Sequence, residues 1–465
     1  MSESVDVCVL GSGAVGQSVA HRARKAGLSV VVIEAQTPGG TCPNRGCDAK
    51  KPYVNAAALR YRSERLHAAG GGIEPASIAW RDITQFKRRF TEPVGGITGR
   101  ELADVGAEVI IGSPKFLDAS TIEVGDRRLS SERIVIATGH QPRELNIPGI
   151  EHTVNSDALL EIDDLPPRVA FIGGGYIGME FACAAAHAGH EVTVLNSREH
   201  TLQSFDPFVV GVMEEALPQL GPHGVRVITN ARVGAVTPAD GGGFVVHRDA
   251  DGTQPLVEVD LVVNSSGRVP SVAGLNLEAA GVEHSPAGVH VDEFLRCPGN
   301  PRVWAGGDVA DNGRPGLIPT AVDDGRILAH NMVAATSEAD MRRRSNAPLC
   351  SVAFTTPMVA GAGMTEAEAR EQHGDAVHVS RGRMNTKKFF RELGQEHIAY
   401  TLVFGDDRTL LGAHFTGEGA DEVINLFGLA LGHDAREHAL HDMTLTYPSI
   451  GSALQGAYRK AVAGL

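Results

Sequence analysis

Two cysteines, Cys42 and Cys47, stand five positions apart in the stretch GGTCPNRGCDAKK at residues 39–51. Helix-prone residues follow from position 48, so we expect Cys47 to lie in the first turn of a helix. The partial positive charge at a helix N-terminus favours a thiolate and lowers the pKa of a cysteine. The alternatives are a pair of inert buried thiols and a zinc half-site, for which a second Cys or His pair at ligand spacing is missing. The pattern therefore favours a nucleophilic thiol pair and no metal.

A repeat in the chain indicates what the thiol pair accompanies. Residues 11–35, GSGAVGQSVAHRARKAGLSVVVIEA, match residues 173–197, GGGYIGMEFACAAAHAGHEVTVLNS. Each copy predicts a strand, a glycine turn, a helix and a second strand, and such continuous apolar strands are typical of a parallel sheet. A GxGxxG turn in this context holds a dinucleotide pyrophosphate. The residues that we assign to the two turns are Gly11, Ser12, Gly13 and Gly16, and then Gly173, Gly175, Tyr176, Ile177 and Gly178.

The two copies end in different residues. The first ends in Glu34, where a carboxylate can accept hydrogen bonds from both hydroxyls of an adenosine ribose. The second has Asn196 at this position, which removes the repulsion that an acid exerts on a 2′-phosphate, and Arg198 can neutralise that phosphate. We expect an unphosphorylated ribose at the first site and NADPH at the second. NADH is the alternative if Arg198 is only a solvated loop residue.

Five motifs, in the order of one family, extend this interpretation. GGTCPNRGC resembles the redox-active disulfide motif of the flavoprotein pyridine nucleotide-disulfide oxidoreductases, which include glutathione reductase, dihydrolipoamide dehydrogenase and mercuric reductase. IVIATG at 134–139 and LVVNSSGRVP at 261–270 resemble their domain-crossing turns, and WAGGDVAD at 304–311 resembles their second flavin motif. VAFTTPMVAGAGMTEAEA at 352–369 is similar to the start of their dimerisation domain. The resemblance covers nearly the whole chain.

The resemblance implies a role for each matching residue. FAD would bind at the first site, with Glu34 on its adenosine ribose and Asp308 on its ribityl chain. Cys47 would be the thiolate that faces the flavin, and Cys42 the interchange thiol that attacks the substrate. Lys50 would pair with Glu180 beside the flavin, and Tyr176 would cover the ring until the nicotinamide displaces it. The further cofactor-binding residues that the motifs imply are Thr41, Thr138, Gly139 and Gly267.

The match fails near the C-terminus, where the family carries a His-Pro and, four residues after the proline, a Glu. Tyr447 takes the place of this histidine and Ser452 the place of the glutamate. Imidazole titrates near pH ~6.5 and phenol near ~10, so a tyrosine is a poor base at neutral pH. Three explanations are open: a nearby group substitutes, the substrate has an acidic leaving thiol, or the acceptor is no disulfide. The candidate substitutes are His438, His441 and Asp442.

Two further departures bear on specificity. Asp48 stands where the family usually has an aliphatic residue, and its charge would raise the pKa of the neighbouring Cys47 if unscreened. This weakens any transfer of glutathione or lipoamide specificity. The sequence ends AYRKAVAGL without a second cysteine pair, so mercuric reductase and high-molecular-weight thioredoxin reductase activities are not expected.

The fold class that the resemblance implies is α/β, with two Rossmann-like dinucleotide-binding domains and a C-terminal α+β dimerisation domain. We expect an FAD-binding domain at 1–150 with a returning segment at 266–346, an NAD(P)-binding domain at 151–265 and a dimerisation domain at 347–465. Turn sequences at 249–253 and 405–409 predict β-hairpins. The resemblance also implies a homodimer, because each active site would need the partner's C-terminal segment.

Charge and composition limit the binding partners and the cellular location that we expect. The 465 residues carry a net charge of −14, which makes nucleic acid and anionic membranes unfavourable partners. The chain has neither an 18-residue apolar run nor a signal-like start, and its 6 cysteines are too few for a disulfide scaffold. We therefore expect a cytoplasmic protein.

The leading hypothesis is an FAD-dependent, NADPH-linked reductase that passes a hydride through flavin to the Cys42–Cys47 disulfide, and on to a small disulfide substrate. Tyr447 completes the expected catalytic set of Cys42, Cys47, Lys50 and Glu180. The first alternative is an NAD(P)H-dependent reductase of quinones, metal ions or oxidants, in which the cysteines only store electrons. The second is a flavin-bound redox sensor. The presence of Lys50, Glu180 and Tyr176 argues against it, because a protein that only binds flavin needs no residues for hydride transfer.

Overall fold

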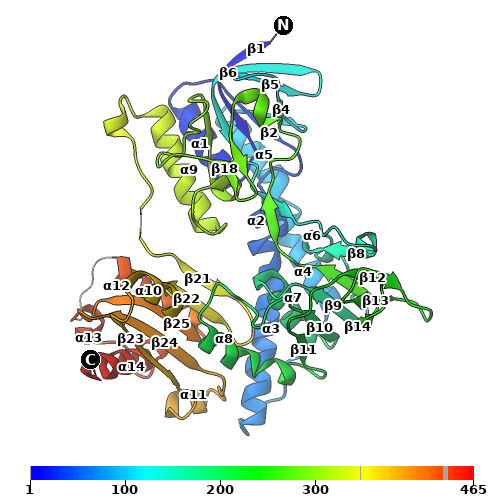
Figure 1. Cartoon of the computed structure of the whole chain (residues 1–465), viewed down its shortest axis with the longest axis vertical. Helices are drawn as coiled ribbons and strands as arrows, with labels where there is room; N and C mark the ends of the chain where they lie inside the picture. The colour runs from blue at the N-terminus through cyan, green and yellow to red at the C-terminus, as the bar shows by residue number, and fades with distance from the viewer. Residues whose placement is uncertain (1, 346, 433–437, 465) are drawn as a thin grey trace. The chain divides into compact units, whose positions relative to one another are not determined.

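The chain divides into two compact units. The computed structural model describes residues 2–345, 347–432 and 438–464, except for the side chains of 438 and 439. The first unit comprises residues 1–51, 85–143 and 268–345, and the second comprises 52–84, 144–267 and 346–465. Figure 1 shows the course of the chain through its helices and strands.

The first unit is built on a sheet with the strand order β3-β2-β1-β6-β5-β4, and β19 pairs with β6. The strands β1, β2, β3, β6 and β19 pair in parallel, and β4 and β5 complete the sheet in antiparallel pairs. The order β3-β2-β1-β6 is that of one half of a Rossmann fold. The strands are β1 (Glu3–Leu10), β2 (Val30–Glu34), β3 (Glu108–Ile111), β4 (Lys115–Phe116), β5 (Thr121–Val124), β6 (Arg127–Ile136) and β19 (Val303–Ala305).

The continuous apolar strands are explained by burial on both faces of this sheet. Along β1, Cys8 and Leu10 belong to one core cluster, whereas Val7 and Val9 belong to another. Helices α1 (Ala14–Lys25) and α9 (Ile318–Val333) contribute to the second cluster and lie side by side, as Figure 1 shows. A Cβ at Gly325 of α9 would be 3.1 Å from the Cα of Val15, so glycine permits this close approach.

Smaller elements complete the first unit. The helix α5 (Val94–Asp104) packs near β3, and α2 (Thr41–Arg45) and the start of α3 (Cys47–Ala68) carry the two cysteines. Strand β7 (His140–Pro142) pairs with β16 (Arg268–Pro270). The remaining elements are β17 (His284–Ser285), β18 (Gly288–His290), β20 (Ala310–Asp311), and the 3₁₀ turns η3 (Leu277–Ala280), η4 (Gly307–Val309) and η5 (Glu338–Asp340).

The second unit contains a parallel sheet in the order β11-β10-β9-β15-β8, with α7 (Tyr176–His187) following β9. The second copy of the repeat therefore forms the predicted strand, turn, helix and strand. Its strands are β8 (Thr153–Asn155), β9 (Arg168–Ile172), β10 (Glu191–Leu195), β11 (Val225–Ile228) and β15 (Leu261–Asn264). An antiparallel sheet follows in β12 (Ala235–Pro238), β13 (Phe244–His247) and β14 (Pro255–Val259), and the turn at 249–253 joins its last two strands as predicted.

The C-terminal part of the second unit is an antiparallel sheet in the order β21-β22-β25-β24-β23, and the predicted hairpin at 405–409 joins β24 to β25. Its strands are β21 (Cys350–Ala353), β22 (Val359–Gly363), β23 (Val377–Arg383), β24 (Ala399–Gly405) and β25 (Leu410–Thr416). Its helices are α10 (Glu366–His373), α11 (Lys388–Glu392), α12 (Ala420–Gly432), α13 (His438–Asp442) and α14 (Ile450–Gly464). The helices elsewhere are α4 (Trp80–Thr91), α6 (Ser156–Leu159) and α8 (Pro207–Glu214), with the 3₁₀ turns η1 (Ile150–His152) and η2 (Leu217–Gln219).

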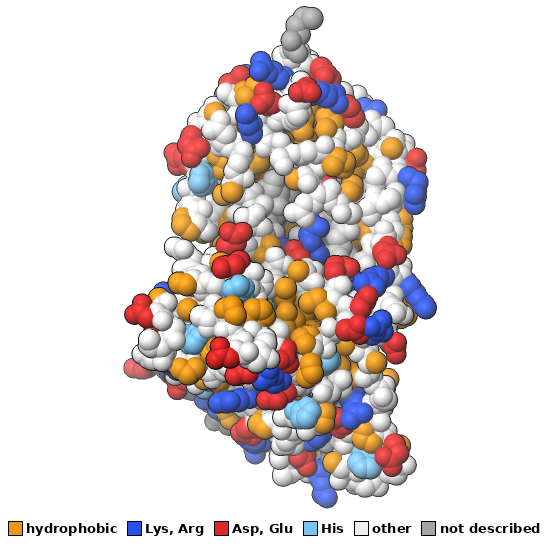
Figure 2. Space-filling model, turned by 90° about the vertical axis from the view of Figure 1, so that its right-hand side faces the viewer, with side chains coloured by type: hydrophobic (Ala, Val, Ile, Leu, Met, Phe, Trp, Pro, Cys, Tyr) orange, Lys and Arg blue, Asp and Glu red, His pale blue; other side chains and the backbone are white. Residues whose placement is uncertain are grey.

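The surface carries charges of both signs. On the face shown in Figure 2, the Lys and Arg side chains lie among Asp and Glu side chains. None of the described helices combines the length and the apolar character that a bilayer crossing needs.

Candidate active site

The two cysteines lie where two helices meet end to end. Cys42 is in α2, and Cys47 is the first residue of α3, which confirms its predicted place at a helix N-terminus. The turn before α2 packs on the first glycine turn: a Cβ at Gly40, whose φ is +78°, would be 2.7 Å from the Cα of Gly13. Thr41 begins α2. The thiol pair is therefore held beside the predicted site of the first dinucleotide.

The two thiols differ in acidity. The pKa of Cys47 is lowered to about 7, first by a hydrogen bond with Cys42 and then, against the effect of burial, by the charge of Lys50. The pKa of Cys42 is raised well above its usual range by the same hydrogen bond and by burial. The charge of Asp48 raises the pKa of both cysteines. The proton of the reduced pair thus resides on Cys42 and the negative charge on Cys47. The main cause is the partner thiol, where the sequence had suggested the helix terminus.

The lowered pKa of Cys47 predicts that the reactivity of this thiol depends on pH and on the charge of Lys50. The reactive form of Cys47 is the thiolate, which is present above a pH of about 7 and is lost as the pH falls through this value. Lys50→Met should raise the pKa of Cys47, and Lys51→Met should raise it less, because Lys51 exerts the smaller effect. The measurement is the rate of Cys47 alkylation in the reduced protein against pH, followed by peptide mass spectrometry. Equal shifts in the two variants would contradict the assignment.

The first glycine turn has the geometry of a phosphate-binding turn. Gly11 has a φ of +107°, and a Cβ on it would be 2.3 Å from the carbonyl oxygen of Ala137. A Cβ on Gly16 would be 2.0 Å from the carbonyl oxygen of Gly11, so α1 can begin here only with glycine. Beside Gly13, by contrast, the nearest atom is 3.8 Å from an added Cβ. The backbone is thus too tight for a side chain at Gly11 and Gly16 and makes only an ordinary van der Waals contact at Gly13, the turn geometry that a pyrophosphate site uses.

Glu34 and Ser12 form a hydrogen-bonded pair at this turn. The Glu34 carboxylate is 7% exposed and accepts hydrogen bonds from the Ser12 N–H at 3.0 Å, the Ser12 hydroxyl at 2.5 Å and the Gln36 N–H at 2.9 Å. The Ser12 hydroxyl in turn accepts from the N–H of Gly39 at 3.0 Å. A carboxylate has about four acceptor positions, so three occupied positions leave one for a ribose hydroxyl. The predicted bonds to both hydroxyls therefore compete with bonds that the protein already makes.

The other predicted flavin residues follow the carboxyl ends of β6 and β19. Thr138 donates its hydroxyl hydrogen bond to the carbonyl of Ser271 at 2.7 Å, and Gly139 has a φ of +65° with open space at its Cβ position. Asp308 lies in η4. Together with the glycine turn after β1 and Glu34 at the end of β2, these residues lie at the edge where open parallel sheets bind ligands.

Asp324 supports this edge and was missed from the sequence. Its side chain is fully buried, and it accepts hydrogen bonds from the N–H of Gly307 at 2.9 Å and from the amide of Asn312 at 2.8 Å. Asp324 thereby fixes the turn that carries Asp308. Burial raises the pKa of this carboxyl. One sequence feature could have indicated it: Asp324 stands at helical spacing from Thr320, Ile327 and Leu328, which form the buried face of α9.

The second glycine turn repeats the geometry of the first. Gly173 has a φ of +109°, and a Cβ on Gly178 would be 2.3 Å from the carbonyl oxygen of Gly173. An added Cβ on Gly175 would meet no atom within 4 Å, so the ligand side of the turn is open. Gly267, after β15, has a φ of +120°. The predicted residues again follow the carboxyl ends of parallel strands, here β9 and β15.

Asn196 stabilises the loop that follows β10. Its side chain is buried, and its amide donates to the carbonyls of Arg198 at 3.0 Å and His200 at 2.8 Å. The Arg198 side chain is exposed, and no described residue forms an ion pair with it. Asn196 therefore shapes the loop that presents a guanidinium to solvent.

Tyr176, Glu180 and Lys50, which are predicted to lie around the flavin, differ in their exposure to solvent. Tyr176 begins α7 with 42% of its surface exposed, and Ile177 follows it. Glu180 lies three residues after Ile177, is 3% exposed, and accepts a hydrogen bond from the N–H of Phe354 at 3.0 Å. Lys50 is 7% exposed and belongs to the first unit, whereas Glu180 belongs to the second. Their predicted pairing stays a prediction.

In the C-terminal motif, Tyr447 stands at the position where the family has a histidine. Tyr447 precedes Pro448 through a cis peptide bond and is 85% exposed. Ser452 has a capping role: its hydroxyl accepts from the N–H of Ser449, whose hydroxyl accepts from the N–H of Ser452, both at 3.1 Å. His441 bonds to Asp442 at 2.8 Å in an exposed position. The side chain of His438 lies outside the described residues.

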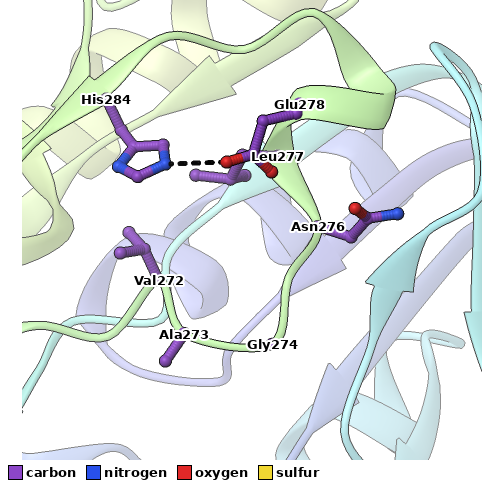
Figure 3. A pocket seen from close by; sticks show the side chains of 7 residues that line it. All are labelled: Val272, Ala273, Gly274, Asn276, Leu277, Glu278 and His284. Atoms are coloured by element: carbon purple, nitrogen blue, oxygen red, sulfur yellow. Dashed lines mark ion pairs between the residues drawn. The ribbon is translucent and has the colours of Figure 1, made fainter.

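A separate hollow of about 370 Å³ contains none of the predicted residues. Figure 3 shows the side chains of His284 and Glu278 facing each other beside it, with their ring nitrogen and carboxylate oxygen 3.6 Å apart. Its lining residues are Val272, Ala273, Gly274, Asn276, Leu277, Glu278 and His284. No group of three or more potential metal ligands occurs within the part of the chain that the structure describes.

Comparison with known families identifies the class. Residues 5–325 match the family model described as pyridine nucleotide-disulphide oxidoreductase, and residues 349–458 match the dimerisation domain of these proteins. The chain belongs to this family and is a flavoprotein disulfide reductase of the glutathione and mercuric reductase type. The family implies FAD and a pyridine nucleotide, which the two glycine turns fit, and the dimerisation domain indicates a homodimer.

Individual relatives fall into several activities. The chain is 30% identical to a glutathione reductase of Nostoc over 93% of this chain and 94% of that one. It is 31% identical to a mercuric reductase of Lysinibacillus sphaericus over 92% of this chain and 77% of that one. The Cu(II) complex of RclA, an HOCl-induced flavoprotein disulfide reductase from Escherichia coli, is similar in structure, with a TM-score of 0.84 and 27% identity over 98% of this chain and 99% of that one.

Proposed function

We propose that the chain is an NADPH-linked reductase of a small disulfide, with Cys42 as the interchange thiol and Cys47 as the thiolate beside the flavin. The observation that carries this proposal is the unequal thiol pair, in which Cys47 has a pKa of about 7 and Cys42 holds the proton. An inert pair of thiols would have raised pKa values at both positions, as the buried Cys8 and Cys297 have.

The roles of the residues follow from this polarity. When bound, FAD supplies the chemistry that converts a hydride from a nicotinamide into an electron pair for a disulfide. Cys42 attacks one sulfur of the substrate, and Cys47 then attacks Cys42 to re-form their disulfide. Lys50 stabilises negative charge on Cys47 and, through its position on the same helix, near the flavin.

We further propose that Arg198 sets the preference for NADPH, because it is exposed on the loop that Asn196 organises. A charge-assisted hydrogen bond contributes about 1.5–3 kcal/mol. Arg198→Ala should therefore raise the KM for NADPH at least about tenfold and that for NADH less than about twofold. Steady-state kinetics with both coenzymes measure this, and Arg232→Ala, an exposed arginine of the same unit, is the control. Equal changes for both coenzymes would reject the assignment.

A second candidate is a reductase of metal ions, quinones or oxidants. Two observations favour it: Tyr447 and Ser452 replace an acid-base pair that ordinary disulfide exchange uses, and the similar RclA structure is a Cu(II) complex. In this case Cys42 and Cys47 hold electrons for an acceptor that needs no proton on a leaving thiol.

A panel of acceptors tests the proposed function. The purified protein is assayed for NADPH and NADH oxidation with small disulfides, quinones and Cu(II), between pH 5 and pH 9. Turnover with disulfides supports the leading proposal, whereas turnover with quinones or Cu(II) alone supports the second candidate. If none of these acceptors supports oxidation of NADPH or NADH, both reductase functions are rejected. The redox sensor is then the remaining hypothesis.

The remaining predictions stand as proposals of the same kind. We propose an FAD-binding domain at 1–150 with 266–346, an NAD(P)-binding domain at 151–265 and a dimerisation domain at 347–465. We also propose that Tyr447 of one protomer completes the site of its partner, and that the protein acts in the reducing cytoplasm.

A further inference from the structure

We propose that Asp48 is a catalytic acid-base residue: it accepts the proton of Cys42 when that thiol attacks a disulfide and returns it to the leaving thiolate. This role rests on the proposed disulfide reductase function. It assigns the proton transfer to a residue of the thiol loop itself.

Asp48 contacts the Cys42 sulfur with two different groups, its carboxylate and its backbone N–H. Sγ of Cys42 lies within hydrogen-bond distance of Oδ2 of Asp48, at 3.7 Å, so the single thiol proton of Cys42 is shared between this carboxylate and the sulfur of Cys47. The backbone N–H of Asp48 also bonds to this sulfur and favours its thiolate form. Asp48 therefore meets the protonated sulfur with a carboxylate and the ionised sulfur with an N–H donor. A general base must lie within hydrogen-bond reach of the proton that it takes, and the Asp48 carboxylate meets this condition.

The local fold explains why this contact is made. Asp48 is the second residue of α3, and Gly46 joins α3 to α2. A Cβ on Gly46 would lie 3.0 Å from the Cα of Cys42, so the absence of a side chain lets the start of α3 approach Cys42 closely. Asp48 and Cys47 are both exposed in the single chain, which leaves the carboxylate open to a substrate.

The charges around the pair assign the two sulfurs different tasks. Lys50 and Lys51 favour negative charge on Cys47, and Asp48 opposes it on both sulfurs. Because Cys47 has two cations and the Cys42 proton in its favour, it keeps the charge. Cys42 is left as the thiol, and it becomes a nucleophile only when its proton is removed during attack.

The reaction balances with the groups that are present. The Cys42 proton moves to Asp48 as the Cys42 sulfur bonds to one sulfur of R–S–S–R; the substrate S–S bond breaks, and RS⁻ leaves. Asp48 gives the proton to RS⁻, which forms RSH. The Cys47 thiolate then attacks the Cys42 sulfur: the S–S bond between Cys42 and the substrate breaks as the Cys42–Cys47 disulfide forms, and the released second RS⁻ takes a proton from water. The two electrons pass from the thiol pair to the substrate.

Asp48→Asn separates this role from simple electrostatics. Removing the negative charge lowers the pKa of Cys42, so alkylation of Cys42 by iodoacetamide should stay equal or become faster. The same variant cannot take up a proton, so reoxidation of the reduced protein by hydroxyethyl disulfide should be about 10²-fold slower. Dithiobis-nitrobenzoate has an acidic aryl thiol as its leaving group and needs little protonation, so its reaction should slow less than about tenfold. Asp48→Glu should restore part of the rate with the aliphatic disulfide.

Stopped-flow kinetics of the prereduced full-length protein give these rates, and peptide mass spectrometry gives the site of alkylation. Asp104→Asn, which removes an exposed charge from α5, is the control. Equal rates of Asp48→Asn and the parent with hydroxyethyl disulfide would overturn the role of Asp48. An equal loss in all three reactions would also overturn it, because a structural defect has that result. If the parent protein reacts with neither disulfide, the proposed function fails, and this role fails with it.

Discussion

Cys42→Ser should lower NADPH-dependent turnover of disulfides at least about 10³-fold, because a hydroxyl cannot replace the attacking thiol in disulfide exchange. The second cysteine does not compensate. In the proposed mechanism, Cys47 at the start of α3 carries the charge and later releases the product by attacking the Cys42 sulfur. The measurement is steady-state oxidation of NADPH with a panel of disulfides, and with quinones in parallel.

Cys350→Ser is the matched control for this variant. Cys350 is also partly buried, its thiol donates to the carbonyl of Ile424, and burial raises its pKa. The control should keep the parent turnover. Disulfide turnover that survives in Cys42→Ser would show that the cysteine pair is not the exit for electrons, whereas quinone turnover that survives in the same variant would favour the second candidate function.

Gly16→Ala should yield a protein that binds FAD at least about 10²-fold more weakly. The added Cβ would lie 2.0 Å from the carbonyl oxygen of Gly11, so the turn or the start of α1 must move. Overpacking of this kind costs typically 1–3 kcal/mol, and ~2.8 kcal/mol corresponds to two orders of magnitude in affinity. The yellow absorbance per polypeptide after purification and a titration of the apoprotein with FAD measure the effect.

Gly99→Ala provides the comparison for this substitution. Gly99 lies within α5 of the same unit, and an added Cβ would meet no atom within 4 Å. Alanine should raise the free energy of unfolding there by about 0.5–1 kcal/mol, because glycine is the poorer helix former. If Gly16→Ala retained the full flavin content of Gly99→Ala, close packing of α1 on the turn would not be a condition for binding.

The repeat allowed the two parallel sheets and their glycine turns to be predicted, because each depends on a local pattern. Continuous apolar strands, glycines at fixed spacing and a helix that starts behind them are read directly from residues 11–35 and 173–197. The place of Cys47 in a first helical turn was predictable for the same reason. The C-terminal sheet was implied by resemblance to the family.

The contacts that the sequence did not disclose join residues far apart in the chain. The bond between Ser12 and Glu34 and the support of Gly307 by Asp324 depend on how strands and helices are packed. The low pKa of Cys47 was expected from a helix terminus, but its main cause is a hydrogen bond with Cys42 across a bend at Gly46. Such contacts follow from tertiary geometry, which residue types and spacing describe only in part.

Ser12 links the two ends of the first site through a single oxygen atom. Its hydroxyl donates to Glu34, at the end expected to hold the nucleotide, and accepts from Gly39, at the start of the sulfur loop. Loss of a buried partner costs about 1–3 kcal/mol, so these bonds tend to form or break together. Ser12→Ala would therefore remove a hydrogen-bond partner from Glu34 and from Gly39 at once, so retention of the nucleotide and the shape of the sulfur loop are coupled properties of this chain.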